Sequence, residues 1–434
     1  MIRARFILLL FLISWFITCG NNTDTGRNGT QENVESTPTT HTAEAQEKLL
    51  QPEDLQYQGA FLLPKEIYGA SRWGYGGMAL TFYPKGDEKS SNDGYPGSLF
   101  GSGHVYDNLV GECSIPQPII SPNKALQELP IATQLQDFMD ITQGLKNTIL
   151  APEDMNVFGG LVYIADGDWL YWSFFQYYSV QPPGDIDYAS HGRSKRDLAH
   201  PEAQGVWHIG PFGTEPFHQK KTANYMFEIP KNWAGNYTQG MSIATGKGDG
   251  PGLAANSYGP ALFAVEPPSN DSNPKNDSVL PATVLLYYPA APENSPQYFP
   301  QWSECDSWEG AVWISSHGKS GVLFAGRRGR GPTCYGEAAA CNDSCSIYKG
   351  YHCYPYEPEF VFYDPKDLAL VAQGKIQSQE IIPYAHLNLT SAFFSSCNYG
   401  VGGAAFDQEN GILYVIQQNA EDPIVHVWAI KGES

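Results

Sequence analysis

Ionisable side chains that could do chemistry occur in a few segments rich in glycine and aromatic residues. Asp306 and Glu309 flank Trp308, and two carboxylates near one bond are what glycoside hydrolysis requires. His104 lies between glycine and tyrosine residues, and a histidine base beside an arginine would suit proton abstraction next to a uronate. Asp306, Glu309 and His104 are therefore the candidate catalytic residues. The alternative for the two carboxylates is that they bond only to backbone amides where a strand begins.

A larger set of aromatic, amide, histidine and arginine side chains has the types that bind sugars. Aromatic rings cover the apolar face of a sugar, while carboxylates, amides and arginines bond to its hydroxyls. The candidate ligand-binding residues are Arg72, Tyr75, Asp107, Asn156, Tyr258, Trp308, Arg327, Arg330, Tyr335, His352 and Asn398. The alternative for the aromatics is packing between structural elements. The alternative for the arginines is pairing with nearby acids in a solvated loop.

The elements that must position these residues are marked by a repeat. A short glycine-containing segment that leads into a strand-like run recurs at 75–80, 158–163, 258–263, 308–313 and 401–406. Such repetition is typical of radial architectures, in which small residues let the backbone approach closely near the axis. The sequence thus predicts an all-β fold, a β-propeller in which each repeat is an innermost strand.

The repeat predicts five blades, with six or seven as alternatives because 116–157 and 230–256 leave room for more. The run 225–229 is assigned to the second blade as an outer strand. The last blade has only three strands in its own part of the chain, so the strand at 55–62 is predicted to complete it and close the ring. A two-sheet sandwich is the main alternative fold.

The two faces of such a ring differ in their connections. Loops that lead into the innermost strands share a face with loops that join second strands to third strands, and this face holds the long connections 174–196 and 326–358. The opposite face is predicted to be joined mostly by short turns. Because long loops on a rigid scaffold are where function concentrates, the loop-rich face is predicted to hold the ligand site.

Composition excludes some partners and leaves cofactors open. The formal charge of -20 argues against nucleic acid, which needs basic residues to neutralise phosphate. No metal site is indicated: the run at 166–168 resembles part of a calcium loop, but it lacks the spacing of one and reads better as a hairpin turn. No cofactor is indicated, and a structural calcium ion stays open. The chain is expected to be a monomer.

The N-terminus predicts export. Basic residues precede an apolar run at 6–17 that is too short to span a membrane comfortably, and Cys19 follows it. Residues 1–19 therefore form an export signal of lipoprotein type with Cys19 as the lipidated residue, and simple secretion is the alternative. Residues 20–49 are expected to be a disordered polar tether, and 50–434 a single propeller domain. The location is then the periplasmic or outer cell surface.

Seven cysteines follow Cys19, which suits an oxidising compartment. Four of them lie within 334–353, where close spacing predicts local disulfides of undetermined connectivity, with one cysteine left over. A zinc site is the alternative, although the spacing lacks a second matching pair of ligands.

Three parts of the chain resemble a family of uncharacterised secreted or lipoprotein bacterial β-propeller proteins. They are 75–80 with Gly103 and His104, 329–336 with 352–356, and 402–406 with 423–427. The resemblance implies a propeller fold and a location outside the cytoplasm. Because no activity is established for that family, it implies no catalytic residues.

These observations predict an extracytoplasmic propeller that binds a carbohydrate on its loop-rich face. Two alternatives stay open: a glycoside hydrolase or polysaccharide lyase that uses the same face, and a surface scaffold that binds a protein partner on the cell surface. Whether the chain is an enzyme is not decided by its sequence.

Overall fold

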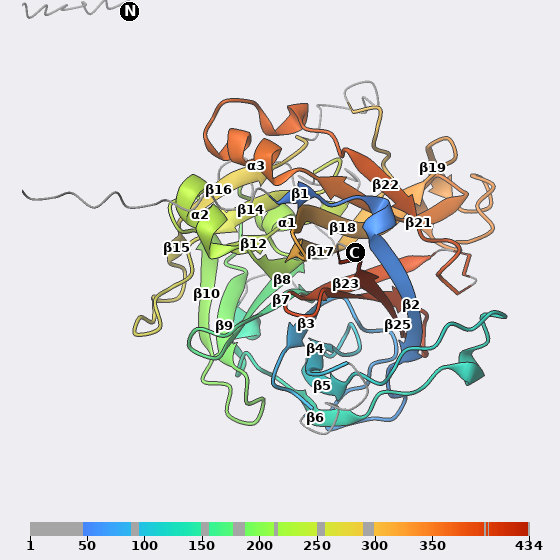
Figure 1. Cartoon of the computed structure of the whole chain (residues 1–434), viewed down its shortest axis with the longest axis horizontal. Coiled ribbons are helices and arrows are strands. Elements are labelled where there is room, and N and C mark those ends of the chain that lie inside the picture. Colours follow the sequence, from blue (N-terminus) through green and yellow to red (C-terminus); the bar gives the residue numbers. More distant parts are fainter. Residues whose placement is uncertain are drawn as a thin grey trace, which may run out of the picture. The chain divides into compact units, whose positions relative to one another are not determined.

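Five small antiparallel sheets surround a common axis, as Figure 1 shows in a view along it. The computed structural model describes residues 47–87, 95–148, 156–176, 187–211, 216–249, 257–289, 299–394, 396–397 and 399–432. The prediction of a five-bladed β-propeller is confirmed. The proposed export signal with Cys19, the tether up to residue 46, and Asn398 lie outside the described residues.

The blades follow one another along the chain, each from its innermost strand outward. Blade 1 contains β3 (Leu80–Tyr83), β4 (Ser98–Ser102), β5 (Val110–Ser114) and β6 (Gln134–Met139). Blade 2 contains β7 (Asn156–Ile164), β8 (Trp169–Gln176), β9 (His191–Lys195) and β10 (Gln204–Ile209), with β15 (Val279–Leu280) at its edge. Blade 3 contains β11 (Met226–Glu228), β12 (Ile243–Thr245), β14 (Leu262–Val265) and β16 (Ala282–Leu286).

The remaining blades use both ends of the described chain. Blade 4 contains β17 (Ser307–Ser316), β18 (Lys319–Gly329), β21 (Tyr356–Tyr363) and β22 (Ala385–Asn388), and it also pairs with β1 (Lys48–Leu49) and β13 (Gly248–Asp249). Blade 5 contains β23 (Gly400–Asp407), β24 (Ile412–Gln418), β25 (Ile424–Ile430) and β2 (Leu55–Leu62). A separate hairpin joins β19 (Cys334–Glu337) to β20 (Lys349–His352).

Helical elements are short and lie between strands. The α-helices are α1 (Gln219–Thr222), α2 (Lys231–Tyr237) and α3 (Pro365–Ala372). Single 3-10 turns occupy Pro52–Asp54, Leu126–Glu128, Leu145–Thr148 and Ser378–Glu380. Across the part of the chain that the structure describes, no helix is long and apolar enough to cross a membrane.

The ring closes as predicted. Strand β2 pairs antiparallel with β25, from Leu55 opposite Ile430 to Leu62 opposite Ile424. The last blade thus obtains its fourth strand from the other end of the domain, and β2 covers the edge that β25 would otherwise expose.

The prediction for blade 3 was wrong. The glycine-marked segment 258–263 leads into β14, the third strand, whereas the innermost strand is β11, for which the sequence predicts a place in blade 2. The segment just before β11 lies against the neighbouring innermost strand β7, and the glycines that allow this close approach belong to β7. A Cβ atom at Gly159 or Gly160 would overlap the backbone of residues 223 and 224, just before β11. The stretches suggested as extra blades instead hold β6 and β12.

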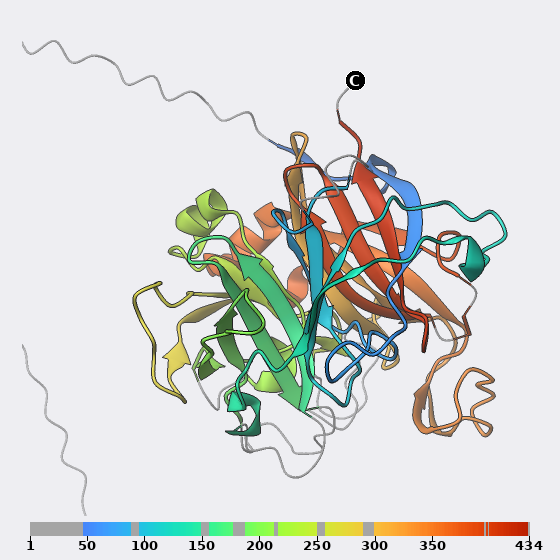
Figure 2. The same cartoon turned by 90° about the horizontal axis from the view of Figure 1, so that it is seen from below.

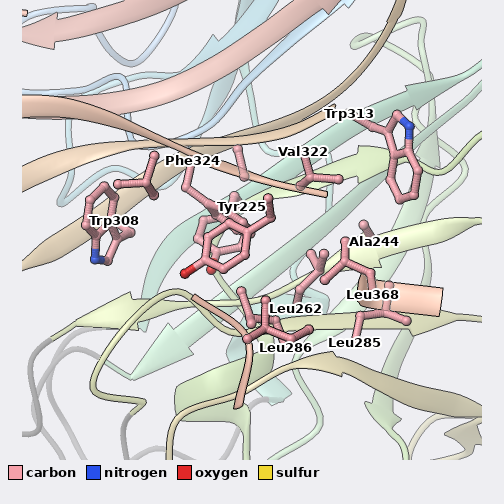
Figure 3. Packing of buried hydrophobic residues seen from close by; sticks show 14 of the residues in the cluster. Tyr225, Ala244, Leu262, Leu285, Leu286, Trp308, Trp313, Val322, Phe324 and Leu368 are labelled. Carbon is pink, nitrogen blue, oxygen red and sulfur yellow. The ribbon is translucent and has the colours of Figure 1, made fainter. Parts of the chain in front are cut away.

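Hydrophobic side chains fill each interface between adjacent blades. Five clusters of buried residues lie between blades 1 and 2, 2 and 3, 3 and 4, 4 and 5, and 5 and 1. Figure 3 shows the interface of blades 3 and 4, where Tyr225, Leu262 and Leu286 face Trp308 and Phe324. Because strand side chains alternate between the two faces of a blade, every blade contributes to two clusters. This packing holds the innermost strands in place around the axis.

Candidate functional site

The predicted candidate residues fall into separate groups on the loop-rich face. Loops leading into β3, β7, β17 and β23 reach this face, as do the loops from second to third strands. The structure brings together one group around Tyr75 and another around the β19–β20 hairpin. Glu309 lies at the axis of the ring, where the five innermost strands meet.

The first group forms an exposed aromatic surface, which we call the Tyr75 platform and define as Arg72, Tyr75, His104, Tyr106 and Asp107. The Tyr75 ring centroid lies 5.7 Å from that of His104, which lies 5.5 Å from that of Tyr106. The Arg72 guanidinium carbon is 5.9 Å from the centre of the Tyr75 ring. Tyr75 is 47% exposed and Tyr106 is 76% exposed, so both rings present area to solvent.

Two loops of blade 1 hold the platform together. The His104 amide donates to the Arg72 carbonyl at 2.8 Å, and the Ser71 hydroxyl donates to Asp107 Oδ2 at 2.7 Å. Tyr75 has a φ of +57°, in the left-handed region that tyrosine rarely adopts. Its amide donates to the Ala420 carbonyl at 2.7 Å, and its carbonyl accepts from the Val105 amide at 3.2 Å. The backbone is therefore held in this conformation from both sides.

Asn156 is tied to the same loop. Asn108, which follows Asp107, donates through Nδ2 to the Asn156 carbonyl at 2.7 Å. Its Oδ1 accepts from the Phe158 amide at 2.8 Å. Blade 1 thereby fixes the start of β7, the innermost strand of blade 2. The Asn156 Oδ1 atom is buried and accepts no hydrogen bond within the described structure.

The axial group consists of Asn224, Ser307 and Glu309. Asn224 Nδ2 donates to Glu309 Oε2, and the Ser307 hydroxyl donates to Glu309 Oε1 at 2.8 Å. Glu309 lines a narrow cavity of about 10 Å³ together with residues of all five innermost strands, including Met78 and Tyr225. That volume is at the lower limit for a single water molecule. The axis is thus nearly closed at this level.

Asn224 and Ser307 were not predicted as site residues. Asn224 immediately precedes β11, so recognising that strand as innermost would have placed Asn224 at the axis. Ser307 begins β17 two residues before Glu309, a spacing that puts both side chains on one face of a strand. That spacing was a signal in the sequence.

Asp306 has a different environment from Glu309. Its side chain is buried and pairs with Arg328, whose Nε lies 2.9 Å from Asp306 Oδ2. Asp306 also accepts hydrogen bonds from the Ser303 hydroxyl at 2.7 Å and from the Gly329 amide at 3.0 Å. Burial raises the pKa of this carboxyl, and Arg328 acts in the opposite direction. Asp306 is therefore engaged in bonds that hold β17 against β18.

The arginine cluster pairs with acids of its own blade. Arg330 contacts Glu357 at 2.7 Å and Glu359 at 2.9 Å, and Arg328 contacts Glu359 at 3.1 Å. The Arg327 guanidinium carbon lies 4.7 Å from the centre of the Tyr356 ring. Arg330 thus pairs with local acids, as the alternative interpretation has it, whereas Arg327 packs against an aromatic ring.

Tyr335 and His352 belong to the β19–β20 hairpin, which extends away from the blades in Figure 2. Tyr335 is exposed and its ring packs against Tyr351, 4.9 Å between centroids. His352 is buried, with Nδ1 2.8 Å from Asp343 Oδ2 and Nε2 3.1 Å from the Gly336 carbonyl oxygen. Within the described residues, His352 thus serves the internal structure of the hairpin.

Three disulfides stabilise this region. They join Cys305 to Cys353, Cys334 to Cys341, and Cys345 to Cys397. The prediction of disulfides is confirmed, but only one pair is local, because the other two tie the hairpin to the loops before β17 and β23. The buried Cys113 is the cysteine left over.

Two further candidates lie inside the interface of blades 3 and 4. Trp308 is fully buried in the hydrophobic cluster shown in Figure 3, and Tyr258 packs there against Phe299. Their rings match the packing alternative. The run 166–168 is a hairpin turn in which Asp168 bonds to Arg196 and Tyr163. In the described ranges, no group of three or more histidine, cysteine or acidic residues could hold a metal ion.

No family model matches the sequence, and no curated protein matches it either. Among solved structures, the chain is similar to a protein of the GH130 family of mannoside phosphorylases, which contains glycoside hydrolases that target β-1,2 mannosidic linkages in Candida mannan. The TM-score is 0.41 at 8% identity, with 89% of this chain and 98% of that chain covered. A candidate glycoside hydrolase from Parabacteroides distasonis gives a TM-score of 0.39 at 10% identity, with 90% and 95% covered.

A β-propeller domain from Myceliophteria thermophila gives a TM-score of 0.27 at 7% identity, with 77% of this chain and 67% of that chain covered. These TM-scores are all below 0.5, so the likeness says nothing of what the site does.

Proposed function

We propose that the chain is an exported β-propeller whose loop-rich face binds a carbohydrate, across the Tyr75 platform toward Glu309. The observation that carries the proposal is the conformation of Tyr75. A tyrosine held at φ +57° by two hydrogen bonds, with its ring half in solvent, is a strained residue whose side chain contributes little to a core. Strain of this kind persists where the surrounding structure fixes it, and such residues cluster at binding and active sites.

The neighbours of Tyr75 have the chemistry of sugar recognition. The exposed rings of Tyr75 and Tyr106 offer flat apolar area to the C–H face of a sugar. Arg72, His104 and Asp107 surround them with donors and acceptors for hydroxyl groups. Met78 lines the axial cavity and follows Tyr75 by three residues, a separation of at most about 11 Å along the chain. A short oligosaccharide on the platform would therefore extend toward Glu309.

Binding is proposed ahead of cleavage because, within the described residues, one of the two candidate catalytic carboxylates is engaged elsewhere. Hydrolysis of a glycoside uses two carboxylates on either side of the bond. Of the two predicted carboxylates, Glu309 lies at the axis, while Asp306 is buried in its pair with Arg328. A hydrolase or lyase becomes the better description if the purified chain releases products from a polysaccharide and Glu309→Gln abolishes that release.

A glycan array probed with the full chain tests the proposal. We expect binding to one class of glycan, lost in Tyr75→Ala and weakened in Glu309→Gln. The matched control is Tyr237→Ala, which removes an exposed tyrosine from α2 and should leave binding unchanged. Thermal unfolding of each variant shows that the fold is intact. If no glycan binds and a protein partner copurifies through the same face, the scaffold function replaces carbohydrate binding.

We further propose that Cys19 carries a lipid that anchors the chain at the outside of a membrane. The proposal rests on the basic and apolar residues before Cys19 and on three disulfides, which suit an oxidising compartment. Labelling cells with a radioactive fatty acid should mark the wild-type chain and not Cys19→Ser. An unlabelled wild-type chain in the exported soluble fraction would instead mean simple secretion.

A further inference from the structure

A second cavity lies on the face opposite the Tyr75 platform, on the side of the connections that join first strands to second strands. It has a volume of about 500 Å³ and is lined by residues from the C-terminal parts of β3, β7, β11, β17 and β23 and the turns that follow them. Ligand pockets for small molecules are typically ~300–1,000 Å³. The narrow axial cavity beside Glu309 lies between this space and the loop-rich face.

Each blade contributes one aromatic side chain to the lining of this opposite-face cavity. The five are Phe82, Tyr163, Phe227, Trp313 and Phe406, one from each innermost strand. Phe227 and Trp313 are buried, and the other three are partly exposed. All five rings also pack in the clusters between blades, so each borders the cavity with only part of its surface. The face of an aromatic ring carries partial negative charge.

The polar residues of the lining are mainly acidic. Glu228, Asp407 and Glu409 carry carboxylates, and Lys231 is the basic residue of the lining. Asp407 already accepts hydrogen bonds in its own turn, from the amides of residues 409 and 410 and from an asparagine side chain. Glu228 and Glu409 have exposed side chains and are left at the rim of the cavity.

Glu228 lies at the rim, where its side chain is exposed but borders the cavity wall. Desolvation raises the pKa of its carboxyl; Lys231 lowers it, and Asp166 raises it further. A positive group near Glu228 would stabilise the ionised form. Aromatic faces and carboxylates together favour cations over anions, and the chain as a whole carries a formal charge of -20.

We propose that the opposite-face cavity binds a small organic cation, of the class of substituted ammonium compounds. The aromatic side chains surround the apolar substituents of the cation, and Glu228 with Glu409 neutralises its charge. An anionic ligand would be repelled by the acidic rim. A neutral sugar would find the aromatic wall but would not use the excess of negative charge.

Isothermal titration of the full chain with choline and with 3,3-dimethylbutan-1-ol tests the proposal. The two compounds have the same shape, but the second has carbon in place of the charged nitrogen. Cation–π attraction and the acidic rim should make choline bind at least about tenfold more tightly than its neutral analogue. Equal affinity for both compounds would overturn the proposal, because the cavity would then select only apolar shape.

Variants locate the binding. Glu228→Gln should weaken choline about tenfold, and Phe406→Leu should weaken it while keeping apolar volume in the interface of the blades. The matched control Glu421→Gln removes an exposed carboxylate near Gly74 on the other face and should leave choline binding unchanged. No heat with choline, or choline binding that survives both Glu228→Gln and Glu409→Gln, would refute the proposed site. Choline binding should also be the same in Tyr75→Ala, so this test is independent of the carbohydrate proposal.

Discussion

Replacing Glu309 by glutamine separates the charge of this side chain from its shape. The amide has the same length as the carboxylate, and its oxygen can still accept the hydrogen bond from Asn224 Nδ2. The Ser307 hydroxyl, which donates to Oε1 at 2.8 Å, can rotate to accept from the new amide. The substitution should therefore keep the innermost strands in place while it removes the negative charge at the axis.

The expected magnitudes follow from these two hydrogen bonds. A hydrogen bond to a charged group contributes about 1.5–3 kcal/mol and a neutral one about 0.5–1.5 kcal/mol. Because Glu309 is partly exposed, we expect a loss of unfolding free energy of about 1–2 kcal/mol, or about 1–3 °C in a chain of this size. A sugar hydroxyl that donates to Glu309 would lose about 1.4 kcal/mol, so glycan affinity should fall about tenfold.

Thermal unfolding and a glycan titration of the same protein samples measure both effects. Glu421→Gln, which removes an exposed carboxylate from a loop on the same face, is the control for general charge. If Glu309→Gln binds the glycan as tightly as the wild type does, the negative charge at the axis does not contribute to glycan binding. A loss of stability several times larger than expected would instead show that Glu309 mainly holds the innermost strands together.

Three further outcomes are expected. Tyr75→Gly should have a free energy of unfolding about 0.5–1 kcal/mol higher than that of Tyr75→Ala, because glycine adopts φ +57° without strain. Both variants should lose glycan binding, and equal stabilities would argue against strain at this residue. Replacing Cys345 and Cys397 together by serine opens a loop of 52 residues and should cost about 4 kcal/mol in denaturant unfolding, whereas a cost near zero would mean that this disulfide leaves the unfolded chain unconstrained. Burial acts to raise the pKa of Asp343, but hydrogen bonds, including one from His352, outweigh it and lower the pKa. The contribution of Asp343 to the free energy of unfolding is therefore complete above the unfolded pKa of about 3.9 and is lost as pH falls through the folded pKa. Asp343→Asn should therefore destabilise the chain at pH 7 and much less in acid, and a penalty independent of pH would contradict this.

The fold was predictable because its repeats are local. Four of the five glycine-marked segments lead into innermost strands, where glycine is required by contact with the next blade. At Gly402, for example, a Cβ atom would overlap the backbone of Gly77. The fifth segment misled the prediction because Gly259 meets a different neighbour, the ring of Trp302. A glycine before a strand thus indicates that another part of the chain packs closely against it, but it does not indicate whether the strand is innermost.

The ring closure was predictable for a different reason. The last blade ended with three strands, and an unpaired strand remained at the start of the domain. Pairing the two covers the edge of the third strand, and β2 pairs with β25 over its full length. The number of strands in the last blade is enough to predict this pairing, without any side-chain contact.

The candidate site was predictable only in part. The loops that carry Tyr75 and His104 could be assigned to one face, but their contact depends on the twist of blade 1 and on a left-handed residue that no pattern marks. Asn224 and Glu309 are 85 residues apart and belong to different blades. Their hydrogen bond follows from the contact of β11 with β17, which the misassigned blade 3 concealed.

The opposite-face cavity could not be seen in the sequence, because an aromatic residue in an inner strand has the same pattern whether it packs between blades or faces the axis. Its independence from the loop-rich face is nevertheless a consequence of the fold. The axial cavity between them holds at most about one water molecule, so a ligand at one mouth does not reach the other. Effects of substitutions at distant sites without shared partners add. In a chain with both Glu309→Gln and Glu228→Gln, glycan binding should fall as in the first variant alone and choline binding as in the second alone. A coupling between the two losses would mean that the innermost strands move together, and the two mouths would then have to be treated as one site.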